Sequence, residues 1–154
     1  MEDQPKLRVL NDPPLDGPMN MARDEALMTL VGASKSPSTL RLYQWDQPTI
    51  SLGYFQHYAD YASLPPPAGG LPVVRRLTGG GAILHDLELT YSLTLAVGHL
   101  LLADGPSRLY ELAHDAVIET LASLGLMAGR RGSSDDSGAA RGPFFCFQRR
   151  HCYD

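Results

Sequence analysis

Cysteine and lysine are both scarce in this chain of 154 residues. The two cysteines, Cys146 and Cys152, are too few for a disulfide scaffold, and their spacing is not the Cys-x-x-Cys of redox or zinc motifs. Lys6 and Lys35 are the only side-chain amines that could act as a nucleophile or base. A zinc site using Cys146, His151 and Cys152 would need a fourth ligand from elsewhere. We therefore favour a reactive or a buried thiol at these positions.

The sequence also lacks long apolar runs and an excess of positive charge. Polar residues or glycine interrupt every apolar stretch within a few residues, which excludes a membrane-spanning helix. Residues 1–12 are acidic and contain no apolar segment, so we expect no secretory signal. The formal net charge of −4 argues against wholesale binding to nucleic acid or acidic lipid. With 44% hydrophobic residues the chain can bury a core, and we expect a cytoplasmic protein without nucleic-acid or membrane partners.

Short β-rich and helical segments alternate along the first half of the chain. We expect a strand at Lys6–Leu10 and a helix from Asn20, as its N-cap, to Gly32. The alternating segments Thr39–Trp45 and Thr49–Phe55 flank an Asp-Gln-Pro turn and predict a β-hairpin.

The second half continues this mixture of strands and helices. We expect a short helix near residues 57–63 and strands at residues 71–77, 82–86 and 89–97. Residues 107–125 carry apolar side chains at helical spacing and end in Gly125, a typical C′ residue. Residues 129–143 are polar and low in complexity, which predicts a mobile loop, and residues 144–154 resemble the start of another strand.

The sharpest local signal is RRLTGGGAILHD, residues 75–86. Three consecutive glycines are unfavourable inside a strand, but they let backbone N–H groups approach a ligand closely. Arg75 and Arg76 precede them and can pair with phosphate or carboxylate, and His85 and Asp86 follow. No Gly-Lys-Ser/Thr and no helix follows the glycines, so neither a P-loop nor a dinucleotide fingerprint is present. A glycine-rich hairpin with solvated arginines and a structural histidine is the alternative.

The segment RRLTGGGAILHD resembles the signature of the superfamily of lipoate–protein ligases, octanoyltransferases and biotin–protein ligases. Residues 20–27 resemble the first helix of that family, and residues 40–56 resemble its Arg-Tyr-x-Trp…Thr-x-Ser-x-Gly-x-x-Gln hairpin. The resemblance implies a mixed-sheet α/β (α+β) catalytic domain, related to class II tRNA synthetases, of which residues 1–154 are the N-terminal portion. It also implies an acyl tunnel lined by the hairpin and the glycines.

Two positions bear on the chemistry that the resemblance implies. ATP-dependent ligases carry an asparagine where this chain has Leu89, and Cys146 falls where LipM-type octanoyltransferases carry their nucleophile. A thiolate attacks thioesters well and leaves well, so the transfer would need no ATP. We therefore expect Cys146 to be catalytic. It would move octanoyl from acyl carrier protein to a lysine of a lipoyl domain, either of a 2-oxoacid dehydrogenase or of the glycine cleavage H protein, without a cofactor or metal.

The remaining site residues and the alternatives follow from the same resemblance. The expected substrate-binding residues are Arg75, Arg76, Thr78, Gly79, Gly80, Gly81, His85 and Asp86. The lysine of the family, in Gly-x-Lys-x-x-Gly-Ser-Ala, would lie just beyond Asp154, and neither Lys6 nor Lys35 matches it. We therefore expect a longer domain that contains this lysine, with a second polypeptide that supplies it or an inactive fragment as the alternatives. An ATP- and Mg²⁺-dependent lipoate ligase and a non-catalytic acyl- or lipoyl-binding module are the alternatives.

Overall fold

The computed structural model describes residues 7–130 and 144–146 of the chain. Their contacts form two compact units. We call residues 7–96 and 144–146 the sheet unit and residues 97–130 the helical unit, and each is described by itself. None of the described helices is long and apolar enough to cross a membrane.

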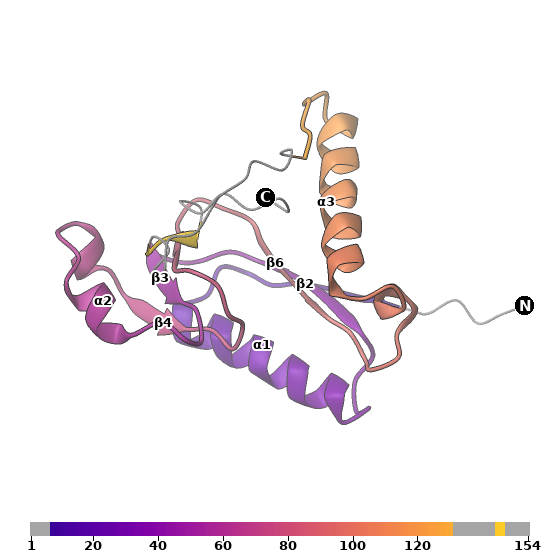
Figure 1. The fold of residues 1–154 in the computed structure, drawn as a ribbon, viewed down its shortest axis with the longest axis horizontal. Helices are drawn as coiled ribbons and strands as arrows, with labels where there is room; N and C mark the ends of the chain where they lie inside the picture. Colours follow the sequence, from indigo (N-terminus) through magenta and orange to yellow (C-terminus); the bar gives the residue numbers. More distant parts are fainter. Residues whose placement is uncertain (1–6, 131–143, 147–154) are drawn as a thin grey trace, which may run out of the picture. The chain divides into compact units, whose positions relative to one another are not determined.

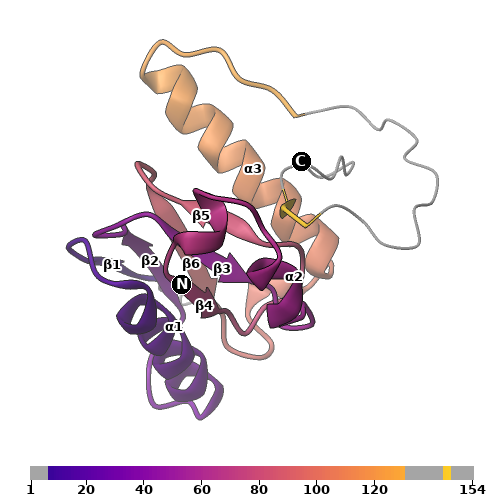
Figure 2. The ribbon, with the colours of Figure 1, turned by 90° about the vertical axis from the view of Figure 1, so that its left-hand side faces the viewer.

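The first sheet of the sheet unit has the strand order β1-β2-β6 (Figures 1 and 2). β1 (Arg8–Asn11) runs parallel to β2 (Thr39–Tyr43), and β6 (Thr90–Thr94) runs antiparallel to β2 on its other edge. The predicted first strand is thus confirmed, shifted toward the C-terminus by one or two residues.

The second sheet has the order β4-β3-β5. β3 (Thr49–Leu52) pairs in parallel with β4 (Val73–Arg75) and antiparallel with β5 (Ile83–His85). Each sheet therefore contains one parallel and one antiparallel pair, as the mixed-sheet fold class requires.

The predicted hairpin between residues 39–45 and 49–55 is wrong. A strand has only two edges for backbone pairing, and β1 and β6 occupy both edges of β2. β4 and β5 likewise occupy both edges of β3. The two neighbouring segments therefore enter different sheets, although both are strands.

Helix α1 (Gly17–Gly32) begins earlier than predicted. Asp16 is its N-cap, and Asp16 Oδ1 accepts a hydrogen bond of 2.8 Å from the backbone N–H of Met19. Pro18 fits this first turn because no intrahelical donor is needed there. Asn20, the predicted cap, is fully buried instead, and its amide donates to the carbonyls of Leu15 and Gln44.

A buried arginine connects α1 to the first sheet. Arg41 is wholly inaccessible, and its guanidinium donates to Asp12 Oδ2 at 2.6 Å, Asp24 Oδ1 at 2.9 Å and Asn20 Oδ1 at 2.7 Å. It also lies 3.9 Å from the centre of the Tyr43 ring. These contacts account for Asn20 and Asp24 within residues 20–27 and for the spacing of Arg41 and Tyr43 in β2.

The charges of this cluster shift the pKa values of its members. Burial alone would raise the pKa of Asp12, but hydrogen bonds and charges from Arg41 and Arg23 outweigh it and hold that pKa below its usual value. Burial, together with the charge and hydrogen bond of Asp24, raises the pKa of Tyr43 far above its usual value. The cluster is therefore most stable with the Asp12 carboxylate ionised and the Tyr43 hydroxyl neutral.

The hydrophobic core of the sheet unit lies against the second sheet. It contains Ile50, Leu52 and Ala82 together with Tyr61 of α2 (Tyr58–Ala62), the predicted short helix. Phe144 and Phe145 pack against this core. The two phenylalanines thus attach a distant part of the sequence to the second sheet.

The helical unit contains a short 3₁₀ turn, η2 (Leu100–Leu102), packed on α3 (Pro106–Ser123). The N–H of Gly125 donates to Ala122 O, and the N–H of Leu126 donates to Leu121 O, which is a Schellman motif. The prediction of Gly125 as the C′ residue is confirmed. Of the predicted loop 129–143, residues 131–143 lie outside the described residues.

Candidate active site

Three segments of the sheet unit meet at one end of the second sheet. We call them the turn segment (Gly53–Gln56), the glycine segment (Gly79–Gly81) and the cysteine segment (Phe144–Cys146). A Cβ atom added to Gly53 would lie 2.1 Å from the carbonyl oxygen of Gly80, which no side chain tolerates. A Cβ added to Gly81 would lie 2.8 Å from Cys146 N and 2.9 Å from Cys146 Cα. Glycine at these positions therefore permits the three backbones to touch.

Backbone hydrogen bonds fix the cysteine segment beside the glycine segment. Ala82 N donates to Phe144 O at 2.9 Å, and Cys146 N donates to Ala82 O at 2.7 Å. These bonds form a short parallel bridge between Ala82 and Phe145. Cys146 is a free thiol and is partly exposed. The alternative of a fully buried core thiol therefore does not describe Cys146.

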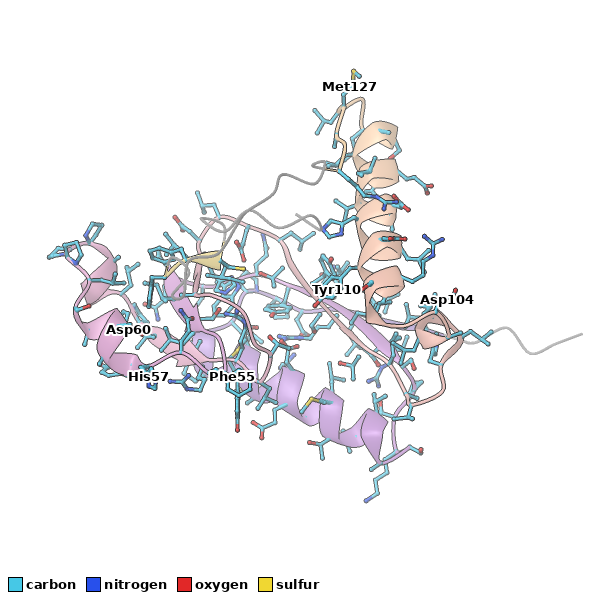
Figure 3. The ribbon with its side chains drawn as sticks, viewed as in Figure 1. Phe55, His57, Asp60, Asp104, Tyr110 and Met127 are labelled. Atoms are coloured by element: carbon cyan, nitrogen blue, oxygen red, sulfur yellow. The ribbon has the colours of Figure 1, made fainter. Side chains whose placement is uncertain are left out.

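Arg75 and Arg76 both bind backbone carbonyls, in different segments. Arg75 Nη1 donates to the carbonyls of Gly53, Tyr54 and Gln56 at 2.7–2.9 Å and so closes the turn segment. Phe55, at the tip of this turn, is 82% exposed (Figure 3). The predicted pair of arginines thus shapes the loops beside the glycines.

Arg76 connects the glycine segment to Ser51 of β3 through four hydrogen bonds. It donates to Gly79 O at 2.8 Å, Gly81 O at 2.6 Å, Ser51 O at 3.0 Å and Ser51 Oγ at 3.1 Å. Burial lowers the pKa of Arg76. None of the ion pairs in the described part of the chain includes Arg76. Its positive charge therefore has no carboxylate partner among the described residues, and it is bonded to Gly81, which packs on the backbone of Cys146.

His85 is buried and bonded through both ring nitrogens. Its Nε2 lies 2.8 Å from Ser51 Oγ and its Nδ1 lies 2.5 Å from Glu88 Oε1, while its ring stacks on Trp45 with centroids 4.0 Å apart. Burial lowers the pKa of His85 and outweighs the opposite effect of Glu88. A carboxylate only accepts, so we assign the proton of the neutral ring to Nδ1 and an acceptor role to Nε2.

These bonds continue from His85 into the first sheet. Trp45 Nε1 donates to Thr90 Oγ1 at 2.9 Å, and the Thr90 hydroxyl donates to Glu88 Oε1 at 2.7 Å. Glu88 therefore accepts from two side chains and holds the His85 ring in one orientation. In the other direction, the Ser51 hydroxyl donates to His85 and accepts from Arg76.

The structure brings some of the predicted site residues together and leaves others apart. The contacts described above join Arg75, Arg76, the glycine segment and Cys146. Ser51 connects His85 to this group. Thr78 is exposed, and its carbonyl accepts from Tyr54 N at 2.9 Å. Asp86 is exposed, and its carboxylate makes no hydrogen bond or ion pair with any residue that the structure describes.

Sequence reasoning assigned no role to four residues that build this site. They are Ser51, Gly53, Gln56 and Glu88. The first three are among the four fixed letters of the Thr-x-Ser-x-Gly-x-x-Gln pattern, so the signal was present in the sequence. Glu88 follows His85 by three residues, and only the fold shows that the two side chains meet.

The described residues contain no group of three or more histidines, cysteines, aspartates or glutamates that could hold a metal ion. The hypothetical zinc ligands His151 and Cys152 lie outside the described ranges, so this hypothesis stays untested.

Comparison with known proteins places this site in a family. Residues 16–139 match the Lipoyl protein ligase A/B catalytic domain. The chain belongs to this family. The superfamily resemblance and the fold class expected from the sequence are therefore confirmed.

Two relatives and two solved structures illustrate the family. The chain is 38% identical over 152 residues to Octanoyltransferase LipM of Moorella thermoacetica, covering 96% of this chain and 54% of the relative. It is 39% identical over 110 residues to Octanoyltransferase LipM of Macrococcus caseolyticus, covering 71% and 40%. The chain thus spans about half the length, or less, of the curated relatives it matches.

The solved structures show a similar arrangement of elements. A T. acidophilum protein with bound lipoic acid superposes with a TM-score of 0.62 at 27% identity, covering 90% of this chain and 55% of the other. Lipoate-protein ligase A bound with ATP superposes with a TM-score of 0.57 at 26% identity, covering 87% and 52%. Both transferases and ligases are therefore among the proteins that this chain resembles.

Proposed function

We propose that this chain carries the acyl-accepting part of an octanoyltransferase of lipoate biosynthesis, with Cys146 as the nucleophile. The observation that carries the proposal is the partly exposed Cys146, fixed by backbone bonds to Ala82 against Gly81. The relatives named Octanoyltransferase LipM support the same activity. The donor would be octanoyl-acyl carrier protein, and the acceptor would be a lipoyl-domain lysine of a 2-oxoacid dehydrogenase or of the glycine cleavage H protein.

The reaction has two balanced steps. In the first, the Cys146 sulfur attacks the thioester carbonyl of the donor. A new carbon–sulfur bond forms, the bond to the carrier sulfur breaks, and the thiol proton passes to the released carrier thiolate. In the second, the acceptor amine attacks the carbonyl of the Cys146 thioester. A carbon–nitrogen bond forms to give an amide, the bond between the carbonyl carbon and the Cys146 sulfur breaks, and the amine proton passes to that sulfur. Because a thioester is exchanged for a thioester and then for a more stable amide, the cycle needs no ATP.

Arg76 would stabilise the negative charge that develops on sulfur and oxygen in both steps. Its guanidinium has no carboxylate partner among the described residues and contacts the carbonyls of Gly79 and Gly81. A positive charge in a partly desolvated site interacts more strongly with such a charge than it would in water. His85, neutral and bonded on both sides, would orient Ser51 and thereby Arg76 rather than act as a base.

Thr78 and Asp86 would contact the donor rather than the reacting atoms. Both are exposed and lie at the two ends of the segment that contains the glycines. An exposed hydroxyl and an exposed carboxylate can bind polar groups of an incoming carrier, whereas the backbone of the glycine segment can approach its acyl chain.

An ATP-dependent lipoate ligase is the second candidate, because one structural neighbour was solved with ATP. Leu89 stands at the position where the ligase signature has asparagine, and its side chain is 64% exposed and apolar. An apolar group there offers no oxygen ligand to Mg²⁺, so we favour a transferase without ATP or Mg²⁺.

The assay that separates these candidates supplies the natural full-length protein with two sets of substrates. One set is octanoyl-acyl carrier protein and a lipoyl domain without ATP; the other is free octanoate, ATP, Mg²⁺ and the same lipoyl domain. The proposal predicts octanoylated lipoyl domain from the first set alone, with ping-pong kinetics. Product from the second set alone would establish the ligase, and octanoate binding without product from either set would establish a binding module.

A further inference from the structure

Gln56 connects the turn segment to the cysteine segment across 88 positions of sequence. Its Oε1 accepts from the backbone N–H of Gly53 at 3.0 Å, and its Nε2 donates to the carbonyl of Phe144 at 3.0 Å. An amide is the only uncharged side-chain group that offers both a carbonyl acceptor and an N–H donor. Both ends of the Gln56 amide are therefore used, one toward each segment.

The turn that carries Gln56 is itself held firmly. Arg75 bonds the carbonyls of Gly53, Tyr54 and Gln56, and Tyr54 N donates to Thr78 O. The carbonyl of Gly80 lies against Gly53 too closely for any side chain to intervene. The Gln56 amide thus projects from a turn with little freedom to move.

The cysteine segment has two polar attachments to the second sheet in the described structure. One is the backbone pairing with Ala82, and the other is the bond from Gln56 to Phe144 O. Phe144 O accepts from both Ala82 N and Gln56 Nε2, at 2.9 Å and 3.0 Å. The backbone pairing fixes the segment along the strand direction, and the side-chain bond holds it from the turn.

We propose that Gln56 is a positioning residue that fixes Cys146 against Gly81, an inference that rests on the proposed function of Cys146. Gln56 Nε2 donates to the carbonyl of Phe144, which lies two positions before Cys146. Its loss would let the cysteine segment shift on the Ala82 pairing. Misplacing a reacting atom by about 1 Å can cost roughly 100-fold in rate, so a modest shift has a large effect.

The decisive variant is Gln56→Glu, which keeps the shape and the acceptor toward Gly53 but removes the donor toward Phe144 O. A carboxylate facing that carbonyl would repel it. Gln56→Met removes both hydrogen bonds without adding charge. It therefore shows whether a defect in Gln56→Glu comes from the lost bond or from the new charge. Gln47→Glu is the matched control, because Gln47 is exposed, lies in the same unit and has no side-chain bond in the described structure.

The experiment measures two quantities in the natural full-length protein. The first is the steady-state transfer of octanoyl, and we expect kcat to fall at least ~10-fold in both Gln56 variants, with KM for the donor changed by less than ~3-fold. The second is amide hydrogen exchange, which needs no activity. We expect the amides of Ala82 and Cys146 to exchange at least ~10-fold faster, while those of β2 stay unchanged.

The outcomes separate this inference from the proposed function. If the parent protein transfers no octanoyl but the exchange changes appear, the proposed function fails and the anchoring role of Gln56 stands. If the Gln56 variants transfer and exchange like the Gln47→Glu control, the inference is overturned. A fall in kcat accompanied by faster exchange throughout the sheet unit would also overturn it, because Gln56 would then stabilise the whole fold.

Discussion

Arg41 and Arg76 are both removed from solvent within the same unit, but their partners differ. Arg41 is wholly buried and meets two carboxylates, Asp12 and Asp24. Arg76 is partly buried, and its hydrogen-bond partners among the described residues are carbonyls and a hydroxyl, from Ser51 and the glycine segment. The charge of Arg41 is neutralised by carboxylates, whereas Arg76 has no carboxylate partner among the described residues and is bonded to Gly81, which packs on Cys146.

This difference separates a structural arginine from one suited to catalysis. A buried cation between carboxylates contributes to a defined arrangement of helix and sheet, and removing it leaves buried negative charge. A cation held by neutral dipoles is oriented by them but remains available to an anion that forms during a reaction. Arg41 therefore belongs to the scaffold, and Arg76 belongs to the proposed site.

The largest expected effect comes from removing Arg41. Arg41→Leu would leave Asp24 without a cation and Asp12 with Arg23 alone, and we expect the free energy of unfolding to fall by about 3–5 kcal/mol. Urea denaturation at pH 7 measures it, with Arg23→Leu as the exposed control. A loss below about 1 kcal/mol would show that the cluster is not a structural element.

Removing Arg76 should affect activity more than stability. Arg76→Gln keeps some hydrogen bonding but removes the charge, and we expect the rate of octanoyl loading to fall about 30- to 100-fold, in line with the loss of one oriented electrostatic group. Stability should fall by less than half of the Arg41→Leu loss. A rate of octanoyl loading within threefold of the parent would contradict the assignment of Arg76 to catalysis and of Arg41 to the scaffold.

Gly81→Ala tests the contact between the glycine and cysteine segments. The added Cβ would lie 2.8 Å from Cys146 N, so the cysteine segment must shift. We expect loading to fall about 10-fold, through displacement of a reacting atom. Gly32→Ala is the control, because a Cβ there meets nothing within 4 Å. Equal loading by the two variants would contradict the packing of Gly81 on Cys146.

The smallest expected effect is a dependence of stability on pH, which separates the contribution of His85 from that of the Asp12 cluster. Burial lowers the pKa of His85, so its contribution to stability is complete above its ordinary value of 6.5 and is lost as the pH falls below it. The lowered pKa of Asp12 makes its contribution complete above 3.8 and lost below that value. Unfolding free energies between pH 8 and 3 should therefore fall in two stages, and His85→Gln should remove only the first. A single stage in the parent protein would contradict this assignment.

Much of this arrangement could be predicted from the sequence. The period of the apolar residues predicted α3 and its end at Gly125. The glycine run predicted a close approach of backbone to a ligand, and the close approach that the structure shows is that of Gly81 to the backbone of Cys146. These features depend on residues that are close in sequence, or on glycine, whose missing side chain permits close contact. The resemblance supplied the fold class and the candidate Cys146.

The features that sequence reasoning missed depend on distant pairings. The hairpin prediction failed because β1 and β6, far from β2 in sequence, occupy its edges. Asn20 was predicted to cap the helix because asparagine is a common N-cap residue. An asparagine can equally be a buried amide, and only the fold shows its bonds to Leu15 and Gln44. Gln56 is a fixed letter of the Thr-x-Ser-x-Gly-x-x-Gln pattern, but its partner Phe144 lies 88 positions away in the sequence.

The intact mass of the natural full-length protein after mixing with octanoyl-acyl carrier protein, without ATP, tests the central claim most directly. We predict the gain of one octanoyl group on Cys146, removed by hydroxylamine, absent in Cys146→Ala and retained in Cys152→Ser. No gain, a gain that requires ATP, or a gain that maps to Cys152 would contradict the assignment of Cys146 as the nucleophile.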